Sequence, residues 1–526
     1  MKKLFSILII CTIVLSSFII VRADEQAPEV PQIRVTTANG NGNSLEKADG
    51  YTDAQISIKG LDNSLLEDAV SFKVRGNSTA MVGISKKAFT FKFSSKKDVL
   101  GMGKGKKWAL LSNTFDPTLM RNYISFDLAK KLGIEYTSEQ KVVELWVDNV
   151  FKGCYLLIEP VQAGSDRVDI DTKGNDGKKD FMIELEALRE DEEVTYFKSS
   201  GFRFGISEPE EPDEEQTAYV KGVIDDVFTA LKSGDREQIE AKLDVESFAK
   251  FYIFNEFLKP LDVNFSSVFF FYKDGKLHAG PPWDYDLCQG NVSETFSNQS
   301  RRALDPENFY VREFHFFSRL TGFDWFKQEA VKVFSENISL FQNIYTYGGV
   351  MDTFLSDYQN VISRNYNEAG WKVNRYWVNV QKVPLATYDE NLDFLRDWLR
   401  TRTTWLANTY SITLPEEPQP TEPTTVTVEP TTVTVEPTTV TEATSETTQP
   451  VETTSPATET TEAPYETGDI NLDRSVNVKD ATLLQMYLAN LKTLSELQLS
   501  LSDVNRDGKI NIKDATVIQK IAAKLI

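Results

Sequence analysis

The sequence has very few cysteine and histidine side chains. It contains 3 cysteines and 2 histidines in 526 residues. Cys11 lies in an N-terminal apolar run, so Cys154 and Cys288 alone remain for the folded part, too few for a disulfide framework. His278 and His315 occur outside any HExxH setting, which argues against zinc hydrolysis and a Ser-His-Asp triad. GxSxG, Walker and GxGxxG patterns are also missing, so any chemistry must come from carboxylates, amines and amides.

Long apolar runs are missing beyond the N-terminus. Residues 1–23 combine two early lysines, an apolar stretch and a small residue, Ala23, before Asp24, which is typical of a cleaved signal peptide. Later runs fall short of the about eighteen apolar residues that a spanning helix needs. We therefore expect a secreted, extracellular chain with no membrane span after cleavage. The net charge of -21 argues against nucleic acid and anionic membranes as partners.

Composition divides the mature chain into three parts. Residues 24–412 contain short alternating apolar runs to about residue 190 and helical periodicity afterwards, which predicts an α+β domain. Residues 413–467 are rich in Thr, Pro and Glu and repeat the heptapeptide EPTTVTV, which predicts an extended, disordered linker. Residues 468–526 form a separate, small C-terminal domain.

The C-terminal domain contains two copies of one acidic pattern. Each copy places Asp or Asn at positions 1, 3, 5, 9 and 12 of a loop that leads directly into a helix. Such alternating oxygen ligands suit Ca²⁺, and we predict two calcium sites. The first should be weaker, because Arg474 stands where the second copy has Gly508 at the sharp turn. The predicted ligands are Asp469, Asn471, Asp473, Asn477, Asp480, Asp503, Asn505, Asp507, Asn511 and Asp514.

These repeats, with Ala-Thr after each twelfth position, resemble a type I dockerin, the module that binds cohesin domains of a cellulosomal scaffoldin. The resemblance covers 468–526 and implies a small all-α, EF-hand-like domain in an extracellular cellulosome. In that family the residues that start each helix face the cohesin, although the same residues could be ordinary first-turn positions. The implied cohesin-binding residues are Ala481, Thr482, Ala515 and Thr516.

The densest cluster of candidate catalytic side chains lies at 259–291. Asp274-Gly275 separates two β-prone runs and predicts a two-residue hairpin turn. Folding the strands about that turn brings Asp262 and Asp284 to the same end of the hairpin. Two adjacent carboxylates repel each other unless a cation or proton is close, so we expect a divalent metal there. The alternative is that both are loop residues without a chemical role.

This cluster and five motifs together resemble the spore-coat protein H (CotH) family of atypical kinases over most of 55–400. The motifs are RGNST at 75–79, KKAFTFKF at 86–93, WALLSN at 108–113 with DPTLMRN at 116–122, YLLIE at 155–159 and PWDYD at 282–286. The resemblance implies a two-lobed, protein-kinase-like domain. It further implies transfer of phosphate from ATP, with Mg²⁺ or Mn²⁺, to a hydroxyl of a protein whose identity the sequence leaves open.

The resemblance also implies roles for individual residues. Asp262 would be the catalytic aspartate and Asp284 a metal ligand. The family pattern has Asn five residues after the catalytic Asp, where this chain has Ser267, while Asn264 lies two residues after it, so both are metal-ligand candidates. In the nucleotide site the resemblance implies Lys86 or Lys87 near the phosphates, with Glu159 as the acid that orients such a lysine. Arg75 either contacts a phosphate or braces a turn. The departure at 267 keeps open an inactive binding module, and paired carboxylates also suit a polysaccharide hydrolase.

Overall fold

The computed structural model describes residues 30–81, 83–173, 179–187, 194–417, 466–471, 476–488, 494–506 and 508–522. The chain divides into two compact units, 1–425 and 426–526, which are described separately. The predicted signal peptide, almost all of the linker, Asp473 and Asp507 lie outside the described residues, as does the side chain of Thr482. In the part that the structure describes, no helix is both long and apolar enough to cross a membrane.

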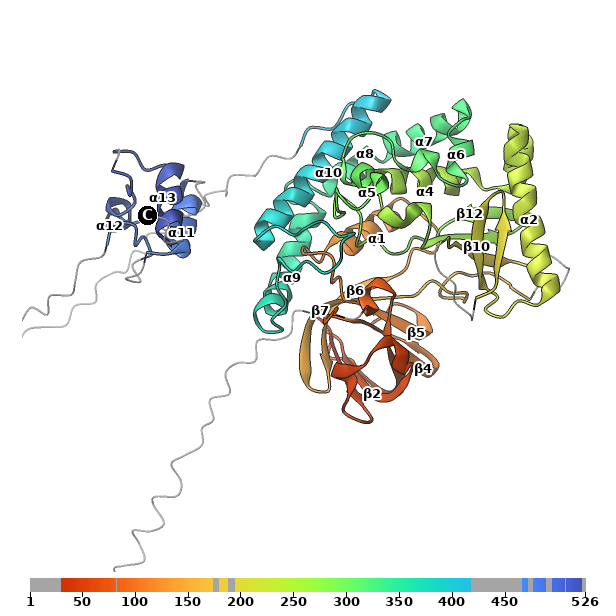
Figure 1. Ribbon diagram of the computed structural model, residues 1–526, viewed down its shortest axis with the longest axis horizontal. Coiled ribbons are helices and arrows are strands. Elements are labelled where there is room, and N and C mark those ends of the chain that lie inside the picture. The colour runs from red at the N-terminus through yellow and green to blue at the C-terminus, as the bar shows by residue number, and fades with distance from the viewer. Residues whose placement is uncertain are drawn as a thin grey trace, which may run out of the picture. The chain divides into compact units, whose positions relative to one another are not determined.

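The larger unit begins with a closed barrel of seven strands (Figure 1). The ring order is β1-β2-β3-β4-β5-β7-β6, and β1 closes it by pairing in parallel with β6. Alternate side chains such as Phe72, Phe91 and Trp108 fill the interior and are fully buried, as a period of two requires. The strands are β1 (Gln32–Thr37), β2 (Thr52–Lys59), β3 (Leu65–Arg75), β4 (Ala88–Asp98), β5 (Lys104–Leu111), β6 (Gln140–Val147) and β7 (Val150–Ile158).

A second, five-stranded sheet has the order β12-β11-β8-β10-β9. Its strands are β8 (Phe181–Leu185), β9 (Tyr196–Ser199), β10 (Phe202–Glu208), β11 (Val268–Lys273) and β12 (Lys276–Ala279). Helix α2 packs on β9 and α4 packs on β12. Strands thus return after residue 190, within the region predicted to be helical.

Helices make up most of the rest of this unit and lie beside the barrel (Figure 1). The helices are α1 (Arg121–Lys131), α2 (Glu214–Ser233), α3 (Arg236–Lys242), α4 (Val245–Leu258), α5 (Asn298–Leu304), α6 (Phe317–Leu320), α7 (Asp324–Glu336), α8 (Ile338–Asn343), α9 (Val350–Asn367) and α10 (Tyr388–Tyr410). The α+β prediction is confirmed, whereas the two-lobed kinase-like layout stays a prediction.

Helix α4 is the element that leads to the candidate site. Ten of its residues are buried, among them Glu256, which pairs with Arg402 of α10 at 2.8 Å. The helix ends where Lys259 adopts a left-handed backbone with φ 49°, followed by Pro260, which cannot continue a helix. The chain then enters the short 3-10 helix Leu261–Asn264, which contains Asp262.

The smaller unit consists of α11 (Val478–Leu488), α12 (Glu496–Ser500) and α13 (Ile512–Ala522) in its described part. Helices α11 and α13 pack against each other around Ile470, Ala481, Leu484, Ala515 and Ile518. Ala481 and Ala515 are therefore core residues with 1% and 0% exposure, because the inner faces of the paired helices need small apolar side chains. Their assignment as cohesin-binding residues stays a prediction, and Thr516 of the same set is exposed.

Candidate functional site

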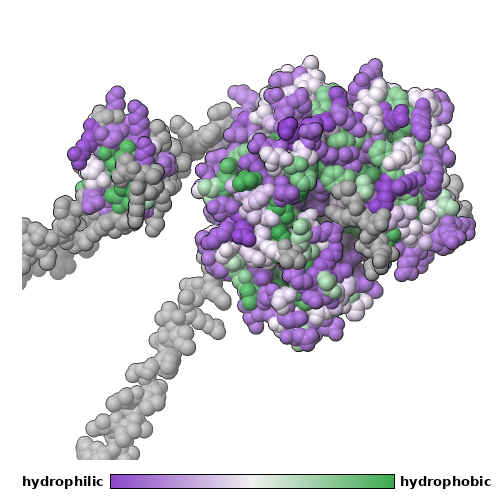
Figure 2. Space-filling model, in the orientation of Figure 1, coloured by the Kyte–Doolittle hydropathy of each residue, from purple (hydrophilic) through white to green (hydrophobic). Residues whose placement is uncertain are grey.

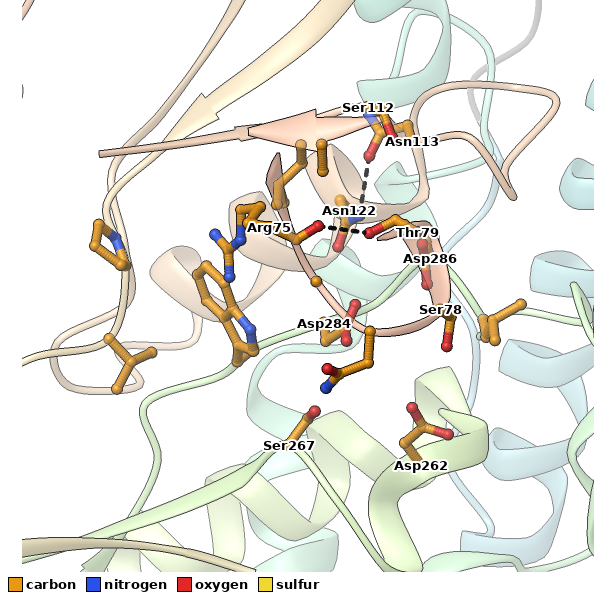
Figure 3. Close-up of a pocket in the computed structure, with 18 of the residues that line it drawn as sticks. Arg75, Ser78, Thr79, Ser112, Asn113, Asn122, Asp262, Ser267, Asp284 and Asp286 are labelled. Carbon is orange, nitrogen blue, oxygen red and sulfur yellow. Dashed lines mark hydrogen bonds between the residues drawn. The ribbon is translucent and has the colours of Figure 1, made fainter. Parts of the chain in front are cut away.

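A cavity of about 320 Å³ lies where the barrel meets the loops around α4 and β12. The side chains that line it come from segments far apart in the sequence, and Figure 3 shows Asp262, Ser267, Asp284 and Asp286 around one space. The barrel side contributes Arg75, Gly76, Asn77, Ser78, Thr79, Thr90, Lys107, Ser112 and Asn113. The other side contributes Asn122, Glu184, Asp262, Ser267, Phe269, Trp283, Asp284 and Asp286.

The hairpin predicted at Asp274-Gly275 is confirmed. Lys273 pairs with Lys276 across the turn, and both turn residues have positive φ, 52° and 81°, as a two-residue I′ turn requires. The strands run back from this turn toward the cavity. Asp262 precedes β11 and Asp284 follows β12, and both line the cavity.

Backbone hydrogen bonds fix the segment of Asp262 to the segment that follows Asp284. Leu261 N donates to Leu287 O at 3.0 Å, and Gln289 N donates to Leu258 O at 2.8 Å. The amides of residues 265 and 266 both donate to the carbonyl of Asp262 at 2.9 Å. The separation of the two aspartates is thus set by main-chain contacts, which vary less than side-chain rotamers.

The carboxylates of the cavity perturb one another. Burial raises the pKa of Asp286 well above its usual value of 3.8, and the nearby Asp284, Asp262 and Asp116 raise it further. A buried carboxyl among like charges favours its protonated form unless a cation is present. This side of the cavity is therefore suited to hold a positive ion.

Two basic side chains line the same cavity. Arg75 lies with its guanidinium 5.0 Å from the Trp283 ring, and its Nη1 is buried with no hydrogen-bond partner among the described residues. Burial lowers the pKa of Arg75, and Asp284 opposes that shift. Burial also lowers the pKa of Lys107. Cations and carboxylates on one cavity suit a metal-bound polyanion.

Lys86, Lys87 and Glu159 are not among the residues that line this cavity. Lys86 donates to Cys154 O at 3.0 Å, and burial lowers its pKa to about 8. Lys87 pairs with Glu46 at 2.7 Å. Glu159 pairs with Arg167 and not with a lysine, and burial raises its pKa to about 7. All three side chains thus have partners within the protein, and their role in nucleotide binding stays a prediction.

The two metal-ligand candidates after Asp262 differ in position. Asn264 donates to Gln299 Oε1 at 3.1 Å and is not among the lining residues, whereas Ser267 lines the cavity. Ser267 has φ 60°, and its amide donates to Glu184 Oε1 at 3.1 Å. Sequence reasoning left Asp286 unassigned although it stands in the PWDYD motif. It also missed Lys107, which carries no local signal.

The two dockerin loops are closed in the same way. Asp480 is fully buried and accepts amide hydrogen bonds from Ile470, Asn471 and Asn477, each at 2.9 Å. In the second copy Asp514 accepts from Asn505 at 3.1 Å and from Asn511 at 2.9 Å. The twelfth residue thus ties each loop to the helix that follows.

Further features of these loops agree with the predicted sequence pattern. Gly508 has φ 80°, the left-handed turn predicted for position six, and its amide donates to Asp503 at 2.9 Å. Asp469 is fully buried. Asp473 and Asp507, which complete the predicted ligand sets, are not described, and among the described residues no group of three His, Cys, Asp or Glu forms a metal site.

Two family models match the chain. The CotH kinase protein model matches residues 72–406, and the type I dockerin domain model matches residues 467–521. No curated protein matches it. Type I dockerin domains bind calcium and are typical of extracellular cellulosome components, so the combination indicates a CotH-like protein that docks to a cellulosome. Because the first of these models matches well over half of the chain, the chain belongs to the CotH kinase protein family, with a type I dockerin domain at its C-terminal end.

Proposed function

We propose that the larger unit transfers the γ-phosphoryl group of ATP to a protein hydroxyl while the dockerin holds the chain on a scaffoldin cohesin. The observation that carries this proposal is the convergence of Asp262, Asp284 and Asp286 with Arg75 and Lys107 on one cavity. Phosphoryl transfer depends mainly on positioning and on charge neutralisation. Carboxylates opposite cations supply both requirements.

Asp262 is the proposed proton acceptor. The hydroxyl oxygen of the acceptor forms a bond to the γ-phosphorus, the bond from that phosphorus to the β–γ bridging oxygen breaks, and ADP leaves with the electron pair. The hydroxyl proton passes to the Asp262 carboxylate. The 3-10 helix and its main-chain bonds to the segment after Asp284 support this role, because they fix the backbone that carries the carboxylate.

Asp284 and Ser267 are the proposed metal ligands. The raised pKa of Asp286 beside Asp284 and Asp262 is the observation that fits a cation here. Bound Mg²⁺ or Mn²⁺ would neutralise charge on the phosphates. Phosphate oxygens and water would supply the remaining ligands, as is usual for Mg²⁺ with nucleotides.

Arg75, the loop that follows it and Lys107 are the proposed contacts of the phosphate chain. Arg75 Nη1 is buried without a partner among the described residues, so a phosphate oxygen would satisfy it. Gly76 has φ 88°, and a Cβ there would come 2.1 Å from Thr79 Oγ1. This tight loop keeps its backbone amides at the cavity, where they can approach an anion closely.

The test is transfer of labelled phosphate from ATP by the purified chain with Mn²⁺, to itself or to cellulosomal proteins. Asp262→Ala and Asp284→Ala should each abolish transfer, and Asp357→Ala, an exposed residue of α9, should not. Thermal stabilisation by ATP should survive Asp262→Ala and be lost in Asp284→Ala. Transfer that persists in both variants would refute the assignment. Sugar release from plant polysaccharide without ATP would instead indicate a carbohydrate-active enzyme.

A further inference from the structure

Four cations lie together on the outer face of the barrel. Along β3, β4 and β5 the residues Phe72, Phe91 and Trp108 point into the core, so their neighbours at alternate positions point outward. The outward positions include Lys73, Arg75, Lys92 and Lys107, which we call the basic strip. The chain as a whole is strongly acidic, with a net charge of -21, so this cluster opposes the general composition.

The strand register places like charges in adjacent positions. Lys92 lies directly opposite Lys107, and Lys73 lies opposite Thr90, one diagonal step from Lys92. Like charges directly opposite each other destabilise a sheet. Farther along the same strands Lys97 pairs with Asp68 at 2.8 Å, whereas no lysine of the basic strip has an ion pair among the described residues.

The other cations of the basic strip act on Lys107. The pKa of Lys107 is lowered first by burial, is opposed by Glu210, and is lowered further by Arg75, Lys73 and Lys92. A sheet that served only as a scaffold would gain stability from a carboxylate at one of these positions. The clustering of these lysines is explained if an anionic partner outside the protein supplies the negative charge that the strands lack.

The basic strip joins the candidate active-site cavity to a second groove. Arg75 and Lys107 line the cavity, while Lys92 and Lys106 line a groove of about 900 Å³. Lys73 connects the two, because it stands opposite the cavity residue Thr90 and its Nζ lies 4.4 Å from the ring of Tyr51, a groove residue. Figure 2 shows a mainly hydrophilic surface with apolar residues between the polar ones.

We propose that the basic strip and this groove bind an acidic polypeptide segment that carries the acceptor hydroxyl. The acceptor residue enters the cavity at Asp262, and acidic side chains on one side of it meet Lys73 and Lys92. Diagonal neighbours in a sheet are about 7 Å apart, twice the rise of about 3.3 Å per residue in an extended chain. Acidic side chains at alternate positions of an extended acceptor therefore match successive lysines. The catalytic part rests on the proposed kinase function, whereas the binding part does not.

The test measures binding of a short fluorescein-labelled peptide, with one threonine followed by glutamates at alternate positions, to the full chain by fluorescence anisotropy. Glutamine replaces glutamate in the control peptide. Lys73→Glu/Lys92→Glu should weaken binding of the acidic peptide by about tenfold or more, and added salt should weaken it in the native chain. Thermal stabilisation by ATP with Mn²⁺ should stay unchanged.

Lys59→Glu is the matched control, because Lys59 is an exposed lysine of the barrel that lies far from the basic strip. It stands opposite Leu65, and Leu65 is eight residues, or about 26 Å, from Lys73 along β3. Lys92→Gln checks folding, and it should raise Tm slightly because it removes the repulsion with Lys107. Equal binding of both peptides, or equal loss in Lys59→Glu, overturns the proposal. Loss of ATP stabilisation with unchanged peptide binding also overturns it, since the strip would then serve the nucleotide. Peptide binding without phosphate transfer refutes the kinase function alone.

Discussion

Loss of the buried ion pair between Glu256 and Arg402 should strongly destabilise the larger unit. Both side chains are 0% exposed. Arg402 donates to Glu256 Oε1 at 2.8 Å, to Glu256 O at 2.7 Å, and to the carbonyls of Pro306 at 3.0 Å and Asn308 at 2.8 Å. The pair therefore ties α10 to α4 and to the loop before Tyr310.

The two partners should not be equally costly to remove. In Arg402→Met the Glu256 carboxylate keeps two amide donors, Tyr310 N at 2.6 Å and Val311 N at 2.9 Å. In Glu256→Leu those amides lose their acceptor and a guanidinium stays buried with carbonyl partners alone. Removing one partner of a buried pair costs about 3–5 kcal/mol, so we expect about 3 kcal/mol for Arg402→Met and about 5 kcal/mol for Glu256→Leu.

These losses are large enough to measure by thermal unfolding. At about 2.1 cal/mol/K per residue over residues 30–417, a loss of about 4 kcal/mol lowers Tm by about 5 °C. All 8 tryptophans lie in the larger unit, so their fluorescence follows its unfolding without a dockerin signal. The double variant Glu256→Leu/Arg402→Met should lose less than the sum of the single losses.

The control is a surface pair on α2. Lys221 and Asp225 are 47% and 43% exposed, so Lys221→Met should cost less than about 1 kcal/mol. If Arg402→Met changed stability as little as Lys221→Met, or if the losses at Glu256 and Arg402 were additive, the two side chains would not act as one coupled unit.

Three other outcomes are expected. Gly76→Ala should lower Tm and abolish stabilisation by ATP, because the added Cβ meets Thr79. The control is Gly83→Ala, at φ 92° with no atom within 4 Å of the added Cβ, which should keep ATP binding. Equal behaviour of the two variants would contradict the loop geometry. Burial lowers the pKa of His315 from 6.5 to about 4, so on acidification the unfolded chain takes up a proton at this residue before the folded chain does. Stability should therefore fall by about 3 kcal/mol as the pH drops from 6.5 to 4. Urea titrations of His315→Gln should lack this loss, and a pH profile of stability unchanged by the substitution would refute the prediction. Chelator should abolish cohesin capture by the dockerin, and capture that persists in excess chelator would contradict this. Gly508→Val should weaken the second calcium site because of its φ of 80°, and unchanged calcium affinity of this variant would contradict that.

Some features of this protein were predictable from short segments. The hairpin at Asp274-Gly275 follows from two residues that accept positive φ, and β3, β4 and β6 follow from alternating apolar side chains. The periodicity of α2 and α10 and the Asp480 and Asp514 loops are equally local. In each case neighbouring residues supply the interactions that select the backbone, so the sequence contains the information within a few positions.

The choice of charged residues at the cavity was decided by the tertiary structure. Lys86, Lys87 and Lys107 are indistinguishable as isolated lysines, yet the pairing of β5 with β4 puts Lys107 at the cavity while Lys86 turns to Cys154. Glu159 likewise meets Arg167, and Ala481 and Ala515 are covered by the packing of α11 on α13. Strand register and helix packing depend on contacts between distant segments, and no local pattern specifies which partner a charged or small side chain will meet.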